Sequence, residues 1–267
     1  MTTASALKCL CDALPVWLAE RIYFRILVRQ SSLPYKTGEA LPLRYAPVSL
    51  VSYLPTDLAH RQMAWLGCYE RKVTVEFMRS ARAGGLCVDV GANIGYYSCL
   101  WAASNPINHV IAFEASPPVF AMLEANVRAA GFDARVQLRP MAVGRQNGSI
   151  DFDPGPVEQT GWGGISLGEG KNTRRVPMQK LDDLIPGGTA IAMLKIDTEG
   201  ADTWVLEGAT ELLRAKLIRR ILFEQNSERM NRLQIPADSA EELLRRCGYK
   251  VTMVSSGGGD RQMYAYI

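Results

Sequence analysis

The chain changes character at Leu86: from there to its end, short apolar runs alternate with segments of helical spacing. Repeated strand–helix units predict a mostly parallel sheet covered by helices on both faces, which is an α/β fold. We expect strands at 86–90, 110–113, 135–143, 190–196 and 217–223, and helices at 94–103, 117–130, 201–213 and 239–246. The last two strands, 250–254 and 262–267, are joined by too short a turn for a parallel crossover, so if they pair they pair antiparallel.

The part before this alternation is organised differently. Apolar residues at helical spacing predict a helix over 1–30, which Pro15 breaks or kinks, and a second helix over 57–82. Four prolines between them predict loop and short extended pieces. We therefore expect residues 1–68 to form an N-terminal helical cap or extension, and residues 69–267 to form a separate α/β domain. The Gly-rich segment 148–175 predicts a hairpin with a long loop.

Charge and hydropathy limit the location and the partners. No run of about 20 apolar residues is long enough to span a membrane, and charged residues interrupt the N-terminal apolar runs, so we expect a cytoplasmic protein. Residues 1–80 hold 10 Lys and Arg against 6 Asp and Glu, whereas the remainder is nearly neutral, which argues against nucleic-acid binding. The basic, amphipathic residues 1–30 leave open a peripheral contact with the inner membrane surface, although packing as part of a lid is favoured.

Acidic residues follow or end four of the expected strands: Asp89, Glu114, Asp197 and Glu224. Ligands of open α/β sheets bind beyond the carboxyl ends of the strands, so we expect these carboxylates around one cleft. Gly91 permits a tight turn after the first strand and a close approach of backbone to a ligand. The following helix points its N-terminal N–H groups toward the same place.

The spacing of these residues indicates a nucleoside ligand. Glu114 comes 23 residues after Gly91, where an acid can hold both hydroxyls of a ribose. Asp89 would repel the pyrophosphate of a dinucleotide but would attract an ammonium group. S-adenosylmethionine carries a ribose, a sulfonium and an amino-acid end without a phosphate, so the pattern favours a methyl donor over NAD.

Five stretches of the sequence resemble the FkbM family of S-adenosylmethionine-dependent methyltransferases. They are "VDVGANIGYYS", "AFEASP", "LDDL", "LKIDTEGADTWVLEGA" and "ILFEQ", in the family's order and spacing. The resemblance covers about 69–267. It implies a class I (Rossmann-like) methyltransferase fold, with a seven-stranded sheet whose last strand is antiparallel, and O-methylation, commonly of a sugar or polyketide hydroxyl.

The resemblance also assigns roles to individual residues. Asp89, Gly91, Ala92, Asn93 and Gly95 would cradle the methionine end of the cofactor. Glu114 would hold the ribose with Ala115 and Ser116 beside it, and Met141, Ala142 and Val143 would flank the adenine. Asp197 would lie at the mouth of the active site. Glu70 would meet the cofactor, with a surface ion pair as an equal alternative.

An alcohol is a poor nucleophile, so a base near its proton helps methyl transfer. The candidates are Asp197, Glu199 and Glu224, with His60 as a further candidate if the N-terminal part folds over the cleft. The same three carboxylates could instead hold Mg²⁺ or Ca²⁺, although buried ion pairing is the favoured alternative. We expect Lys195 to pair with a carboxylate such as Glu224, and Trp162 either to stack on a sugar ring or to cover the core.

The sequence as a whole therefore predicts an S-adenosylmethionine-dependent O-methyltransferase. The acceptor would be a hydroxyl of a sugar, glycolipid, polysaccharide or related natural product. An NAD-dependent oxidoreductase and a non-catalytic cofactor-binding domain are the alternatives. The oligomeric state is not predicted.

Overall fold

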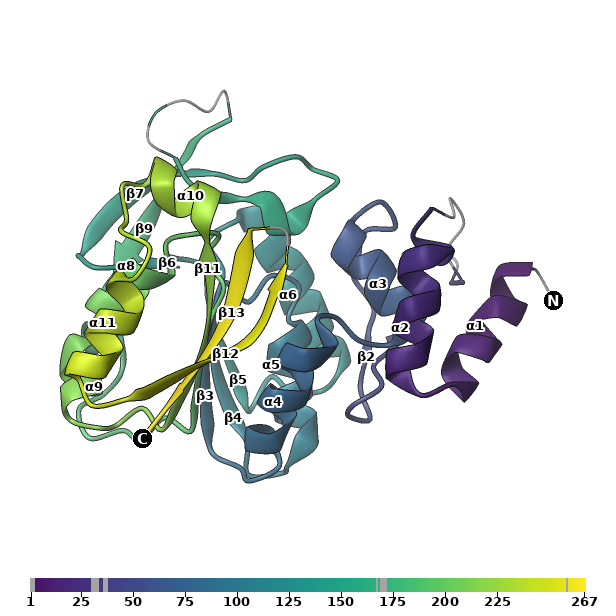
Figure 1. Ribbon diagram of the computed structural model, residues 1–267, viewed down its shortest axis with the longest axis horizontal. Coiled ribbons are helices and arrows are strands. Elements are labelled where there is room, and N and C mark those ends of the chain that lie inside the picture. The colour runs from purple at the N-terminus through teal and green to yellow at the C-terminus, as the bar shows by residue number, and fades with distance from the viewer. Residues whose placement is uncertain (1–2, 30–33, 36–37, 167, 169–171, 258) are drawn as a thin grey trace.

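A computed structural model describes residues 3–29, 34–35, 38–166, 168, 172–257 and 259–267, and a large mixed sheet lies at its centre (Figure 1). In spatial order its strands are β12 (Lys250–Gly257), β13 (Asp260–Tyr266), β11 (Arg220–Asn226), β10 (Met193–Ile196), β3 (Leu86–Val90), β4 (His109–Phe113) and β5 (Val136–Arg139). The strands from β11 to β5 are parallel, whereas β13 is antiparallel to both β11 and β12. The expected seven-stranded α/β sheet with an antiparallel last strand is confirmed.

Helices cover both faces of this sheet and form two separate hydrophobic layers. One face packs on α4 (Arg71–Ala81), α5 (Tyr96–Ser104) and α6 (Pro117–Ala129), the other on α8 (Asp202–Glu207), α9 (Thr210–Arg214) and α11 (Ser239–Arg246). Successive residues of β3 alternate between the layers, since Cys87 belongs to the first cluster and Val88 to the second. Burial on both faces explains why the strands are continuous apolar runs.

A smaller sheet continues from the end of β5. Its order is β6 (Ala142–Val143), β9 (Arg174–Gln179), β7 (Gly148–Asp153) and β8 (Gly164–Ile165). Because β7 and β9 pair antiparallel across a long loop, the expected Gly-rich hairpin is confirmed for the described residues. The loop includes the short helix η2 (Thr160–Trp162), and α7 (Leu181–Leu184) and α10 (Ser227–Arg232) complete the elements of this part.

The N-terminal helices form a lobe beside α5 and α6 (Figure 1). It contains α1 (Thr3–Ala13), α2 (Val16–Arg25), η1 (Leu27–Arg29), β1 (Leu41–Pro42), β2 (Ser49–Leu50) and α3 (Leu58–Leu66). Tyr23 and Leu27 pack with Trp65 in a cluster of their own, whereas Leu41 and Leu50 belong to the cluster of the main sheet. Within the described ranges, no helix is both long and apolar enough to cross a membrane.

Several predicted elements are divided in the structure. The helix expected over 1–30 is broken at Pro15, as anticipated. The helix expected over 57–82 was wrong as a single element, because Gly67 adopts φ 67° and ends α3. A Cβ at Gly208 would lie 2.0 Å from the carbonyl oxygen of Gly144, and the helix expected over 201–213 is interrupted there.

Two predicted strands also need correction. The strand expected over 135–143 ends at Arg139, and after Pro140 the chain joins the smaller sheet as β6. The strand expected over 217–223 is Arg220–Asn226, so Glu224 pairs with Gln262 inside the strand and does not follow it.

Two deletions test which part of residues 1–68 belongs to the main core. Removal of residues 1–38 takes away the partly buried Tyr35 at the edge of the main cluster, whereas removal of 1–55 also deletes the buried Leu41, Leu43 and Leu50. Each lost leucine costs about 2–5 kcal/mol in a packed core. We therefore expect the longer deletion to melt at a clearly lower temperature in calorimetry. Equal melting temperatures would contradict the shared core, and a disordered shorter variant would move the boundary of the main domain.

Candidate functional site

A cavity of about 820 Å³ lies at the carboxyl ends of β3, β4, β10 and β11. The N-terminal lobe and η2 contribute to its walls, because Tyr23, Met63 and Trp162 line it as well. Most of the predicted site residues line it too: His60, Glu70, Gly91, Ala92, Asn93, Glu114, Ala115, Met141, Ala142, Val143, Asp197, Glu199 and Glu224. The structure thus brings together residues that are up to 164 positions apart, from His60 to Glu224.

The turn after β3 is shaped by a contact within the chain. Gly91 has φ 78°, and a Cβ there would lie 1.8 Å from the backbone oxygen of Asp197. The N–H of Asp197 in turn donates to the oxygen of Val90 at 2.9 Å. We expected the backbone at Gly91 to lie close to a ligand, and the structure shows that it also lies close to the backbone at the end of β10. Any side chain at Gly91 would push the ends of β3 and β10 apart.

Three predicted cofactor residues lie behind the cavity lining. Asp89 is 2% exposed, and its carboxylate accepts a hydrogen bond from Oγ of Ser98 at 2.6 Å. Burial raises the pKa of Asp89 to about 6. A Cβ at Gly95 would lie 2.7 Å from a methyl of Leu123, so Gly95 lets α5 pack against α6. Ser116 is buried just before α6.

Glu114 is held by backbone donors at the edge of the cavity. Its Oε2 accepts the N–H of Asn93 at 2.9 Å, and its Oε1 accepts the N–H of Ser116 at 2.8 Å. Burial raises the pKa of Glu114 to about 7, although these backbone donors oppose the shift. The carboxylate is thereby fixed in orientation with lone pairs remaining for a ligand.

The carboxylate of Asp197 reaches the cavity above a buried cation. Nζ of Lys195 lies 3.1 Å from Oδ2 of Asp197 and is fully buried. Burial alone would lower the pKa of Lys195, but Asp197 and the nearby carboxylates of Glu70, Asp202 and Asp89 raise it above its usual value. The ion pair expected for Lys195 is therefore made with Asp197, and the suggested partner Glu224 was wrong.

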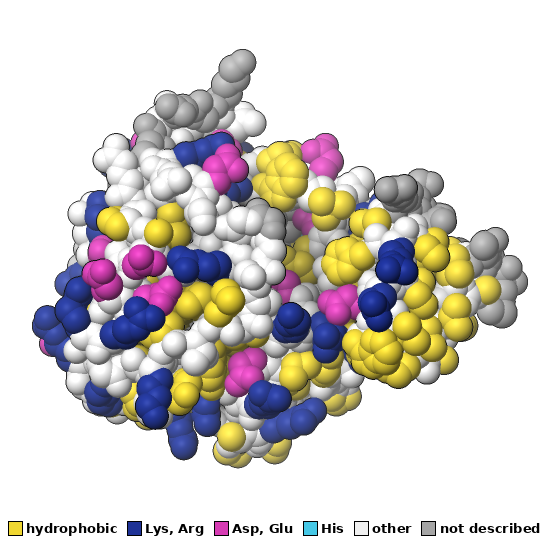
Figure 2. Space-filling view, viewed as in Figure 1, with side chains coloured by type: hydrophobic (Ala, Val, Ile, Leu, Met, Phe, Trp, Pro, Cys, Tyr) yellow, Lys and Arg dark blue, Asp and Glu magenta, His cyan; other side chains and the backbone are white. Residues whose placement is uncertain are grey.

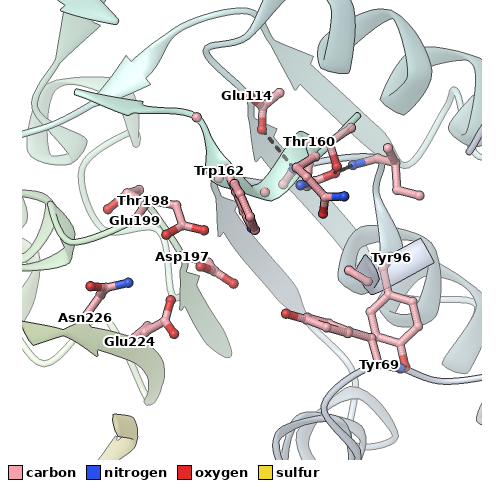
Figure 3. Close-up of a pocket in the computed structure, with 18 of the residues that line it drawn as sticks. Tyr69, Tyr96, Glu114, Thr160, Trp162, Asp197, Thr198, Glu199, Glu224 and Asn226 are labelled. Carbon is pink, nitrogen blue, oxygen red and sulfur yellow. Dashed lines mark hydrogen bonds between the residues drawn. The ribbon is translucent and has the colours of Figure 1, made fainter. Parts of the chain in front are cut away.

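Further carboxylates gather on the same side, as Figure 3 shows for Asp197, Glu199 and Glu224. Nε2 of Gln262 lies 3.2 Å from Oε1 of Glu70 and 3.1 Å from Oε1 of Glu224, and so it bridges the two carboxyl groups. Burial, reinforced by Asp197 and other carboxylates, raises the pKa of Glu224 well above its usual range. In the described part of the chain, no group of three or more His, Cys, Asp or Glu side chains is arranged to hold a metal ion.

Glu199 connects the acidic side to the loop above it. Its carboxylate pairs with Nε of Arg229 at 3.2 Å, and the same guanidinium donates to the backbone oxygen of Trp162 at 2.9 Å. Burial nevertheless raises the pKa of Glu199 to about 8, and the like charge of Asp197 adds to this rise. The indole of Trp162 is 53% exposed and lines the cavity, so it covers no core.

His60 reaches the cavity because the N-terminal lobe folds over it. Its Nδ1 accepts the N–H of Leu54 at 3.0 Å, and its Nε2 lies 3.3 Å from Oγ1 of Thr160. A nitrogen that accepts an N–H carries no proton, so the neutral ring is protonated at Nε2. Burial lowers the pKa of His60, which keeps the ring neutral. Both nitrogens are therefore engaged.

The hydroxyl of Thr160 joins three separate parts of the chain. It lies 3.0 Å from Oδ2 of Asp57 at the start of α3 and 3.0 Å from Oδ1 of Asn93 in the turn after β3. The backbone N–H of Thr160 also donates to Asp57 at 2.7 Å. This network holds the N-terminal lobe, the loop of the smaller sheet and the glycine turn together.

Sequence reasoning missed several residues that arrange the site. The hydroxyl of Tyr97 lies 3.4 Å from Oε2 of Glu70. The hydroxyl of Tyr96 accepts the N–H of Tyr69 at 3.1 Å. The two tyrosines after the turn therefore position the Tyr69-Glu70 segment. The repeated tyrosine was the available signal for them. Gln262 and Thr160 had none, because their partners lie between 38 and 192 positions away along the chain.

The raised carboxyl pKa values predict a pH-dependent stability. Between pH 6.5 and 8.5 the carboxyls of the unfolded chain are ionised, whereas the folded state still binds protons at Glu199 and Glu224. Unfolding therefore releases protons, and the free energy of unfolding falls as pH rises through this window. We expect a lower melting temperature at pH 8.5, and a weaker dependence in Glu224→Gln than in the exposed control Glu124→Gln. A melting temperature that rises with pH would contradict the assignment.

One curated relative and several solved structures are similar to this chain. A curated relative, the AMB antimetabolite synthetase AmbE of Pseudomonas aeruginosa, is 26% identical over 202 residues, and the alignment covers 62% of this chain and 10% of that protein. This chain thus spans about a tenth of that relative's length. The structure of precorrin-6y C5,15-methyltransferase from Geobacter metallireducens aligns with 14% identity and a TM-score of 0.43, over 72% of this chain and 86% of that chain. An O-methyltransferase from Bacillus cereus in complex with SAH aligns with 14% identity and a TM-score of 0.43, over 74% and 80%.

The sequence model of the methyltransferase FkbM domain matches residues 89–251, which is more than half of the chain. The matched region begins at Asp89 and contains Glu114, Asp197 and Glu224. The family match confirms the expected methyltransferase domain and S-adenosylmethionine as its cofactor, and it sets aside the NAD-dependent alternative. The chain belongs to the FkbM methyltransferase family.

Proposed function

We propose that the chain is an O-methyltransferase whose acceptor is a hydroxyl of a sugar, glycolipid, polysaccharide or related natural product. The observation that carries the proposal is the position of Asp197. Its carboxylate faces the cavity between Glu114 on one side and Glu199 and Glu224 on the other, and Nζ of Lys195 lies 3.1 Å from its Oδ2. A charged carboxylate at this point can accept the proton of a hydroxyl.

One side of the cavity suits the cofactor. Glu114 would hold the ribose hydroxyls, and 141–143 would flank the adenine, since these residues line the cavity next to one another. The turn at 91–93 would receive the methionine end with its backbone. The bound cofactor supplies a methyl group on a positively charged sulfur, and the carboxylates around Asp197 complement that charge.

The other side of the cavity suits a polyhydroxylated acceptor. Glu199, Glu224 and Asn226 place hydrogen-bonding groups there, and Trp162 offers an exposed ring face next to them. The raised pKa of Glu224 favours its protonated form, whose O–H would donate to an oxygen of the sugar. Several polar groups beside one aromatic ring can bind both the hydroxyls and the apolar face of a sugar.

Among the candidate bases, the geometry favours Asp197. His60 is occupied at both nitrogens by Leu54 and Thr160, so it serves better as a clamp than as a base. Glu199 is committed to Arg229, and Glu224 holds its proton. The N-terminal lobe would act as a cap that excludes water, because Tyr23, Met63 and His60 line the cavity.

The substitution Asp197→Asn tests the proposed base. We expect cofactor affinity to stay within a few-fold and turnover to fall by about 100-fold or more, because the amide cannot take the hydroxyl proton. The measurement is transfer of labelled methyl from S-adenosylmethionine to a glycolipid extract of cells that lack the protein. The exposed control Asp133→Asn should keep full activity. Near-normal turnover in Asp197→Asn would move the role to Glu199 or Glu224.

The substitution Glu114→Ala tests the proposed ribose contact. We expect S-adenosylhomocysteine to bind about 1.5–3 kcal/mol more weakly in calorimetry, because the hydrogen bonds of a charged group are lost. The exposed Glu124→Ala, on α6, is the matched control. An unchanged affinity in a folded Glu114→Ala variant would remove this residue from the cofactor site.

Thermal-shift titration tests the cofactor class before any acceptor is known. S-adenosylhomocysteine should raise the melting temperature and NADH should not. Binding of S-adenosylhomocysteine without transfer to any acceptor in the extract would favour the non-catalytic alternative.

A further inference from the structure

The outer face of α2 exposes large apolar side chains next to arginines. Trp17, Arg21, Phe24 and Arg25 follow one another at spacings of four, three and one, so they share one face of the helix. Trp17 is 50% and Phe24 56% exposed, which is unusual for side chains of this size. Figure 2 shows hydrophobic side chains gathered around basic ones over the N-terminal helices. We call these four residues the α2 outer face.

The carboxylates near this face are engaged with other basic residues. Glu20, at the edge of this face, pairs with Arg71 at 2.9 Å. Asp12 contacts Lys8 and also lies near Arg44. Among the residues that the structure describes, no carboxylate forms an ion pair with Arg21 or Arg25. The α2 outer face is therefore both apolar and positively charged.

This face continues into the wall of the cavity. Phe24 belongs to both, and its neighbours Tyr23 and Val28 line the cavity from the same part of the chain. Leu10 and Ile26, which are 49% and 57% exposed, extend the apolar surface onto α1 and past the end of α2. A surface that covers the α2 outer face would thus lie next to the N-terminal rim of the cavity.

We propose that the α2 outer face docks on an anionic phospholipid bilayer. Aromatic rings at the level of the headgroups combine with arginines that meet acidic lipids, which is how short amphipathic helices lie on membranes. The rim of the cavity at Phe24 then faces the bilayer surface. Membrane docking does not depend on the proposed acceptor or on methyl transfer.

A second copy of the chain fits this face less well. In a two-fold contact the same surface meets itself, so Arg21 and Arg25 would face the arginines of the partner. Like charges at such a contact oppose association, whereas an anionic bilayer complements them. The charge of the face therefore selects the membrane over self-association.

Flotation with vesicles tests the proposal on the full chain. We expect binding to vesicles of phosphatidylcholine and phosphatidylglycerol in equal parts, weak binding to pure phosphatidylcholine, and release by salt. Each arginine near the surface contributes about 1 kcal/mol, so R21A/R25A should bind about 25-fold more weakly. W17S/F24S should lose binding. Matched controls elsewhere, R82A/R219A and Ile107→Ser, should bind as the unchanged chain does.

The proposal is overturned if the unchanged chain does not float with anionic vesicles, or if it binds neutral and anionic vesicles equally. It is also overturned if the control variants lose binding to the same extent. A dimer in sedimentation velocity that W17S/F24S converts to a monomer, without vesicle binding, would assign the face to self-association. A melting temperature and a far-UV circular dichroism spectrum equal to those of the unchanged chain establish that each variant is folded.

Discussion

The ion pair between Lys195 and Asp197 is the interaction on which the rest of the site depends. Lys195 is fully buried in the central strand β10, and it is attracted by Asp197, Glu70, Asp202 and Asp89. Lys195 and Arg229, which pairs with Glu199, are outnumbered by the carboxylates around the cavity, so the site is short of positive charge. The raised pKa values of the surrounding acids are the consequence, because each of them is buried beside like charges. Removing the lysine would leave the half-buried carboxylate of Asp197 without the cation with which it pairs.

This shortage of positive charge explains the choice of cofactor in physical terms. A ligand with a cationic sulfur and an ammonium group relieves the repulsion among the carboxylates, whereas a pyrophosphate would increase it. We infer that the site is electrostatically complete only when the cofactor is bound. The Gln262 amide, which bridges Glu70 and Glu224, makes the same compensation on a smaller scale without a charge.

Structural features that depend on neighbouring residues could be predicted from the sequence, whereas features that depend on contacts between distant residues could not. The apolar runs and the turn at Gly91 are local, and so the strands, the antiparallel end of the sheet and the position of Glu114 could be predicted. Division of elements at Gly67 and Gly208 was missed, because contacts with residues far along the chain decide where those glycines are needed. Pro140 offered a local signal for the end of β5 that was not used.

The partners of the charged and polar side chains were harder to predict than the positions of these residues in the fold. Periodicity placed Asp197 and Lys195 near one strand end, but only the packing of β10 between β3 and β11 decides that they pair with each other. The network around Thr160 joins segments about 100 residues apart and has no local pattern. It is this network that turns the N-terminal lobe from an extension of the chain into a wall of the cavity.

The most direct test of the whole account is a crystal structure of the chain with S-adenosylhomocysteine. We expect the ribose hydroxyls to lie within hydrogen-bonding distance of Glu114. We also expect the sulfur to face Asp197 and the side of the cavity lined by Glu224 and Trp162. A ligand in the opposite orientation, with its sulfur away from Asp197, would contradict both the proposed base and the division of the cavity into a cofactor side and an acceptor side.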